Sequence, residues 1–109
     1  MTGDALEIIR QEVENNPVVL YMKGSPDFPQ CGFSAQAAEA LKICGVPFKA
    51  VNVFEDEEVY RQGVKLYANW PTIPQLFVKG ELVGGSDIII DLYKSGELQT
   101  MLQEAADAA

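Results

Sequence analysis

The stretch VVLYMKGSPDFPQCGFSAQAAEALKICG, residues 18–45, decides the fold. It opens with the short apolar run Val18–Met22, which favours a buried strand. Residues 23–30 contain one glycine and two prolines and therefore predict a loop. From Cys31 onward the residues are mostly helix formers, and Gly45 is a typical residue to end a helix. The stretch thus predicts a strand, a loop and a helix that begins at Cys31.

The segments on either side complete an alternating pattern of helices and strands. We expect helices over residues 4–15, 56–67, 86–94 and 97–105, and strands over residues 48–53, 75–78 and 81–83. Two strands joined by a helix should run parallel, and the last two strands should form a hairpin. This order predicts one domain, residues 1–109, with an α/β, thioredoxin-like fold: a four-stranded mixed sheet flanked by helices on both faces.

Three details of these elements are specific enough to be checked. Asp4 is expected to cap the first helix, with Glu7 three residues later as its capping-box partner. Ser86 is the expected N-cap of the helix that follows the hairpin. The acidic and alanine-rich residues 104–109 are expected to fray.

Composition excludes several classes of function. The net charge is −8, from 8 basic and 16 acidic residues, which disfavours nucleic acid and anionic membrane surfaces as partners. The chain has no histidine, so any site must be built from cysteine, carboxylates, lysine, arginine and backbone groups. No apolar run approaches the ~20 residues of a membrane-spanning helix, and no secretory signal opens the sequence. We therefore expect a cytoplasmic protein.

The two cysteines, Cys31 and Cys44, have different predicted roles. If both lie on one helix they are about 20 Å apart, too far for a disulfide between them. Cys31 at a helix N-terminus, with Lys23 at the other end of the loop, favours a reactive thiolate, although a small buried hydrophobe is the alternative. Cys44 is expected to face the core, with a regulatory disulfide as its alternative. Ser34 stands where a Cys-x-x-Cys motif has its second cysteine. Because serine cannot resolve a mixed disulfide, the chain cannot use an intramolecular dithiol cycle.

Four ordered blocks spread over most of the chain resemble the CGFS class of monothiol glutaredoxins. They are Lys23-Gly24-Ser25-Pro26, Cys31-Gly32-Phe33-Ser34, Trp70-Pro71-Thr72-Ile73-Pro74-Gln75-Leu76-Phe77 and Gly84-Gly85-Ser86-Asp87. The resemblance implies that Cys31 is the working thiol and that a groove beside it binds glutathione.

The resemblance also implies a role for each residue of that groove. Lys23 and Arg61 would pair with the glycine carboxylate of glutathione, although Arg61 can equally be an ordinary surface arginine. Within Thr72-Ile73-Pro74, a cis Ile73-Pro74 bond is expected, and the Ile73 backbone would pair with the cysteinyl part of glutathione as an added strand does. At Ser86 and Asp87, the amide N–H groups would hold the γ-glutamyl carboxylate, and the Asp87 carboxylate would take the α-amino group.

The family further implies a [2Fe-2S] cluster, for which Cys31 would be the protein ligand. Such a cluster takes four thiolates, or histidines in place of some of them. One chain cannot supply that set, whereas Cys31 from two chains and two glutathiones can. The chain should therefore be a homodimer with the cluster and a monomer without it. Recipient apoproteins would be partners, and a BolA-like protein near Trp70-Pro71 is a further one.

Two other functions stay open at this point. In the first, Cys31 attacks glutathionylated proteins as a glutathione-dependent thiol-disulfide oxidoreductase. In the second, the chain is an interaction domain without a cofactor. The loop between Lys23 and Cys31 is longer than in dithiol relatives, which favours a cluster carrier over rapid thiol exchange. The hypothesis of an interaction domain gives Lys23, Arg61 and Asp87 no shared function.

Overall fold

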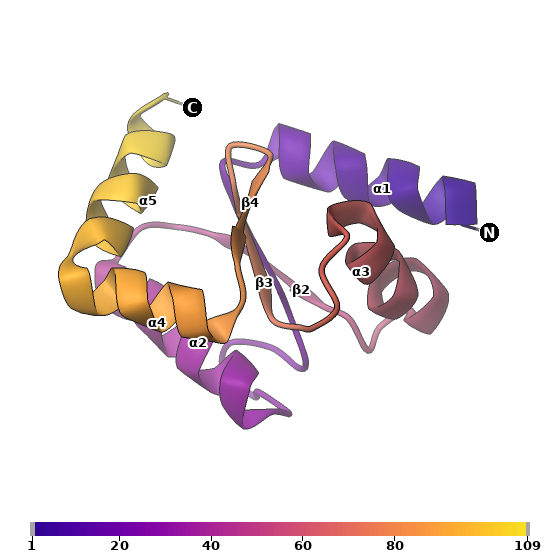
Figure 1. Ribbon diagram of the computed structural model, residues 1–109, viewed down its shortest axis with the longest axis horizontal. Coiled ribbons are helices and arrows are strands. Elements are labelled where there is room, and N and C mark those ends of the chain that lie inside the picture. The colour runs from indigo at the N-terminus through magenta and orange to yellow at the C-terminus, as the bar shows by residue number, and fades with distance from the viewer. Residues whose placement is uncertain (1, 109) are drawn as a thin grey trace.

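A mixed four-stranded sheet lies between two layers of helices in the computed structural model, which describes residues 2–108 (Figure 1). The strand order is β2-β1-β3-β4, with β1 at Val18–Met22, β2 at Lys49–Asn52, β3 at Gln75–Val78 and β4 at Glu81–Gly84. Strand β1 pairs parallel to β2 and antiparallel to β3, and β3 and β4 pair antiparallel. The predicted thioredoxin-like arrangement is confirmed.

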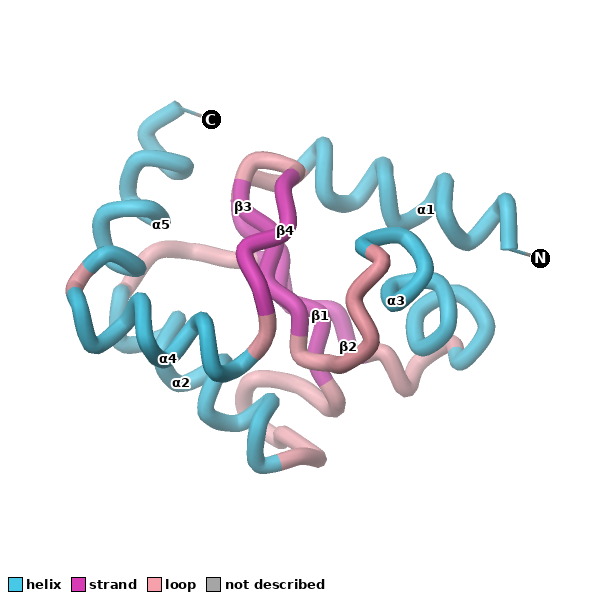
Figure 2. The backbone as a smooth tube through the Cα atoms, in the orientation of Figure 1, coloured by secondary structure: helices cyan, strands magenta, loops and turns pink. Residues whose placement is uncertain are grey.

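Helices cover both faces of this sheet. They are α1 at Thr2–Asn15, α2 at Gly32–Cys44, the π-helix η1 at Glu57–Gln62, α3 at Gly63–Ala68, α4 at Ser86–Ser95 and α5 at Glu97–Ala108. Helices α1 and α3 lie on one side of the sheet, and α2, α4 and α5 lie on the other (Figures 1 and 2).

Alternation along the central strand β1 divides the core in two. Val18, Leu20 and Met22 point to the layer of α2, α4 and α5, while Val19 and Tyr21 point to the layer of α1 and α3. Successive side chains of a strand face opposite sides, so a strand between two helical layers must be apolar at every position. All five residues of β1 are buried, which accounts for the uninterrupted apolar run in the sequence.

Two predictions about the ends of the chain are wrong. Helix α1 begins at Thr2, so Asp4 lies inside its first turn and is not the N-cap, and Glu7 bonds Arg10 instead of closing a capping box. Helix α5 continues to Ala108, so residues 104–108 are helical; Ala109 lies outside the described residues. Burial of Leu102 and Ala105 against the sheet explains why this last helix is longer than its composition suggests.

Three boundaries in the middle of the chain also differ from the prediction. Strand β2 is shorter, since Phe48 and Val53 lie outside it. The helix expected over residues 56–67 is a π-helical turn followed by the short α3, with the Asp56 carboxylate accepting from the Val59 amide as its N-cap. Gly85 is the N-cap of α4, and Ser86 is the first helical residue, because β4 runs one residue further to Gly84.

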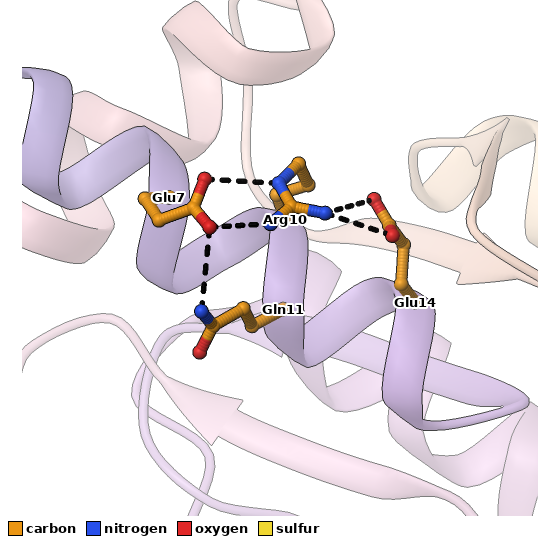
Figure 3. A network of polar contacts seen from close by, with 4 residues as sticks. All are labelled: Glu7, Arg10, Gln11 and Glu14. Atoms are coloured by element: carbon orange, nitrogen blue, oxygen red, sulfur yellow. Dashed lines mark hydrogen bonds and ion pairs between the residues drawn. The ribbon is translucent and has the colours of Figure 1, made fainter.

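The solvent face of α1 carries a network of charged side chains around Arg10 (Figure 3). Its Nε donates to Glu7 at 2.9 Å, its Nη1 donates to Glu14 at 2.9 Å, and Gln11 donates to Glu7. The bonds with Arg10 hold the pKa of Glu7 below its ordinary value. Spacings of three and four residues place these groups on one helix face, and such exposed pairs stabilise a helix only modestly.

Within residues 2–108, no helix combines the length and the apolar character needed to cross a bilayer.

Candidate functional site

Cys31 lies at the point where the loop after β1 gives way to helix α2. It is the N-cap residue, with an extended backbone (φ −156°, ψ 137°), and α2 starts at Gly32. Its side chain is partly exposed and forms no disulfide. The first amide groups of a helix have no partner within it and carry the positive end of the helix dipole. The position therefore combines access for a reactant with a field that favours a thiolate.

The neighbours of Cys31 lower the pKa of its thiol below the ordinary value. The largest cause is the backbone N–H of Ser34, and the Phe33 N–H, the Lys23 charge and the Ser34 hydroxyl act in the same direction against partial burial. Each of these groups interacts better with a thiolate than with a thiol. The lowered pKa predicted from the sequence is thus supported by geometry.

Ser34 has a structural role that its place in the motif does not reveal. The residue is fully buried, and its hydroxyl oxygen accepts a hydrogen bond from the Lys23 amide at 3.0 Å. The first turn of α2 is thereby joined to the end of β1. Ser34 bonds both the start of the loop and the thiol at its end, so it fixes the distance between Lys23 and Cys31.

The loop between these two residues is itself ordered by hydrogen bonds. Its ends meet where the Gln30 amide donates to the Lys23 carbonyl at 2.9 Å, and Lys42 of α2 donates to the Pro26 carbonyl at 2.8 Å. Gly24 has φ +89°, and a Cβ there would lie 2.5 Å from the Phe28 carbonyl oxygen, so the turn requires glycine. The Phe28 side chain, in the loop that ends at Cys31, is 75% exposed.

A second pair of segments meets beside the start of α4. The Ile73-Pro74 peptide bond is cis, as the resemblance implies. A Cβ on Gly85 would lie 3.4 Å from both the Pro74 carbonyl oxygen and the Trp70 indole nitrogen, and 3.9 Å from the Thr72 hydroxyl. This close approach places Thr72 and Pro74 next to the helix start at Ser86 and Asp87.

Arg61 is connected to the Cys31 loop through β2. The Asn52 side-chain oxygen accepts from the Gly24 amide at 3.1 Å and from the Phe54 amide at 2.9 Å. The Arg61 guanidinium lies over the Phe54 ring, 5.8 Å from its centre, and pairs with Glu57 at 3.0 Å. Asn52 thus links the segment that carries Arg61 to the loop that begins at Lys23.

The predicted residues thus lie in three groups, on segments that adjoin the strands at one end of the sheet (Figure 2). The groups are Lys23 with Cys31, Arg61 on η1, and Thr72, Ile73 and Pro74 beside Ser86 and Asp87.

Two residues of this framework were not predicted. Asn52 lies at the end of a strand, where its oxygen bonds two amides across a loop. Gln75 is fully buried, and its amide nitrogen donates to the Trp70 and Thr72 carbonyls at 3.0 Å each. A glutamine at the start of an otherwise apolar strand was the available signal for a buried polar role.

Cys44 lies at the opposite end of α2. It is buried among apolar side chains, and burial raises the pKa of its thiol. The prediction that Cys44 faces the core is confirmed, as is the expectation that the two cysteines are not joined. Among residues 2–108, no group of three or more His, Cys, Asp or Glu side chains is placed to hold a metal ion.

Comparison with known proteins identifies this arrangement. Glutaredoxin 4 of Haemophilus influenzae is 52% identical over 103 residues, which cover 94% of this chain and 95% of that protein. Glutaredoxin 4 of Escherichia coli K12 is 52% identical over 101 residues, covering 93% and 87%. The solution structure of reduced poplar apo GrxS14 superposes with a TM-score of 0.76 at 48% identity, covering 91% of this chain and 90% of that one.

The family model that describes glutaredoxins matches residues 18–83, from β1 into β4. Cys31 and Ser34 stand at the two ends of the four-residue motif at the start of α2, so the motif has one thiol only. The chain belongs to the glutaredoxin family, in its monothiol class.

Proposed function

We propose that this glutaredoxin binds glutathione and, with it, holds a labile [2Fe-2S] cluster between two copies of the chain, for assembly or transfer of iron–sulfur clusters in the cytoplasm. The observation that carries the proposal is the accessible Cys31 thiol, whose pKa is lowered and which has Ser34 where a second cysteine would resolve it. A thiolate that cannot close an intramolecular disulfide remains available as a ligand.

Glutathione would lie along the three groups of residues described above. Lys23 and Arg61 supply positive charge for the glycine carboxylate, and the Ile73 backbone, fixed by the following proline, supplies strand-like bonds. The start of α4 at Ser86 supplies amide N–H groups for the γ-glutamyl carboxylate, and Asp87 supplies a carboxylate for the amino group. A tripeptide with two carboxylates and one amine matches this distribution of charge.

One chain together with one glutathione supplies half of the cluster's ligands and no more. Cys31 is accessible, Cys44 is buried at the far end of α2, and the sequence has no histidine. Four thiolates are reached when two chains each contribute Cys31 and one glutathione. Half of the ligands would then be exchangeable small molecules, which suits a cluster that is handed to recipient apoproteins or shared with a BolA-like partner.

The test is anaerobic reconstitution with iron, a cysteine desulfurase and cysteine, with and without glutathione, followed by visible spectroscopy and gel filtration. We expect the absorption of a [2Fe-2S] cluster and a dimer only when glutathione is present. A colourless monomer under all conditions would overturn the cluster proposal.

The second candidate is glutathione-dependent thiol exchange, and the partly exposed Cys31 thiol, whose pKa is lowered, favours it as well. It would be supported if the colourless protein rapidly removed glutathione from a glutathionylated substrate.

A further inference from the structure

The inner side of helix α1 carries a carboxylate that joins three elements. Glu12 is partly buried, and its two oxygens accept from different tyrosines: Oε1 from Tyr21 of β1 at 2.8 Å, and Oε2 from Tyr60 of η1 at 2.6 Å. Hydrogen bonds from hydroxyl groups to a carboxylate are short and stronger than those between neutral groups. The carboxylate thus connects the first helix, the central strand and the π-helix.

The two tyrosines are held in this arrangement by their rings. The Tyr21 and Tyr60 ring centres are 6.1 Å apart, and Tyr21 meets Phe77 edge-on at 5.7 Å. Burial, followed by the bond to Glu12, raises the pKa of both hydroxyls far above their ordinary value. Both tyrosines therefore remain hydrogen-bond donors at any physiological pH.

Tyr60 directly precedes Arg61 in the π-helical turn. π-helical turns are rare and are found preferentially at functional sites, since they displace a side chain from its α-helical direction. Gly63, the first residue of α3 and the one that directly follows the turn, also lies close to α1, because a Cβ there would lie 2.9 Å from Ile9 and 3.2 Å from Ala5. The backbone that carries Arg61 is thus placed by its contacts with α1, and the bond between Glu12 and Tyr60 is a polar contact among them.

We propose that Glu12 is a positioning residue for ligand binding: through the Tyr60 hydroxyl it fixes the π-helical turn so that Arg61 is directed at the glycine carboxylate of glutathione. The inference rests on the proposed glutathione site and adds to it a residue outside the groove. Tyr21 holds the other oxygen of the same carboxylate from a strand that is already paired on both sides.

The test uses Tyr60→Phe, which removes the hydroxyl and keeps the ring. Binding of glutathione is compared by calorimetry with binding of its analogue in which the glycine carboxylate is an amide. We expect Tyr60→Phe to weaken glutathione binding about three- to tenfold, because the hydrogen bond that positions Arg61 is lost. Binding of the amide analogue should be unchanged. An equal loss for both ligands would indicate a general structural defect and overturn the inference.

The matched control is Tyr21→Phe, which removes the other hydroxyl bond to the same carboxylate. We expect it to lower stability as Tyr60→Phe does but to change glutathione affinity less than about twofold, because β1 does not carry Arg61. A Tyr21→Phe variant that weakens glutathione binding as much as Tyr60→Phe does would contradict the inference.

A third variant, Arg61→Gln, tests the proposed glutathione site separately from the positioning role of Glu12. If Arg61→Gln leaves glutathione affinity unchanged, the assignment of Arg61 to the glutathione site is wrong. If it weakens binding while Tyr60→Phe does not, the site stands and the role of Glu12 is wrong. The combined variant should bind no more weakly than Arg61→Gln alone, because both changes act on one contact.

Discussion

Helix α2 carries a cysteine at each end, and the two environments are opposite. Cys31 precedes the helix, is partly exposed, and receives hydrogen bonds from Ser34 and Phe33 that lower its pKa. Cys44 ends the helix, is 8% exposed among apolar side chains, and has a raised pKa. The same side chain is thus an accessible thiol with a lowered pKa at one end of the helix and a buried part of the core at the other.

The largest effect expected from this comparison follows removal of each sulfur in turn. Cys31→Ser should abolish cluster binding and thiol reactivity while the circular dichroism spectrum stays native, since the residue is outside the core. Cys44→Ser should retain the cluster and lose about 1 kcal/mol of stability, because a hydroxyl replaces a thiol in an apolar site. Iron content and urea unfolding of both variants measure these effects. Loss of the cluster in Cys44→Ser would show that Cys44 has a role in cluster binding besides its place in the core.

A second prediction concerns the rates at which the two thiols are alkylated in the native protein. Cys44 should react with iodoacetamide at least about a hundredfold more slowly than Cys31, because it is reached only through local opening. Mass spectrometry of peptides from a time course measures both rates in one sample. Comparable rates under native conditions would contradict the burial of Cys44.

The contributions of the two thiols to the free energy of unfolding should change in opposite directions with pH. The folded pKa of Cys31 is lowered, so its stabilising contribution is present above its ordinary pKa and is lost as pH falls through the folded value. The folded pKa of Cys44 is raised, so its contribution is present at lower pH and is lost as pH rises through the folded value. Urea unfolding of the wild type and of each single serine variant, from pH 5 to 10, separates the two contributions.

Ser34→Ala should reduce the difference between the two cysteines. It removes the hydroxyl donor to Cys31 and leaves the Lys23 amide without its acceptor, so the pKa of Cys31 should rise and the protein should lose about 1–3 kcal/mol of stability. The pH profile of Cys31 alkylation and urea unfolding measure the two effects. An unchanged profile would mean that the groups this variant keeps, chiefly the backbone N–H of Ser34, account for the whole shift.

The smallest loss of stability should follow Lys23→Gln, which keeps the backbone hydrogen bonds of Lys23 to Ser34 and Gln30. The Lys23 charge ranks below the backbone N–H groups of Ser34 and Phe33, but above the Ser34 hydroxyl, among the causes that lower the pKa of Cys31. The pKa of Cys31 should therefore rise at least as much as in Ser34→Ala, and the difference from wild type should shrink at high salt, because salt screens exposed charges. A smaller rise than in Ser34→Ala would reverse this order of causes.

Much of the fold could be predicted from the sequence, because strong local signals agreed with packing. The apolar run of β1 and the stop at Gly45, which adopts a left-handed C-cap (φ 75°), each gave one clear answer. The ends of α1 and α5 could not be predicted, because burial of Ala5 and Ala105 extends helices that composition alone would shorten. The π-helical turn at η1 leaves no periodic signal over six residues.

Prediction of the site was uneven for a similar reason. Cys31, Lys23 and the cis Ile73-Pro74 bond lie in motifs, so the sequence indicated them. Asn52 and Glu12 act by bonding segments far apart in the chain, and no local pattern marks such partners. Support for a site comes from tertiary contacts and was therefore visible only in the structure.

Native mass spectrometry of the freshly reconstituted protein would measure directly whether Cys31 and glutathione together hold one cluster between two chains. We expect a species with two chains, two glutathiones and one [2Fe-2S] cluster, which dissociates to apo monomers when the cluster is lost. A cluster held by a single chain, or by two chains without glutathione, would contradict this expectation.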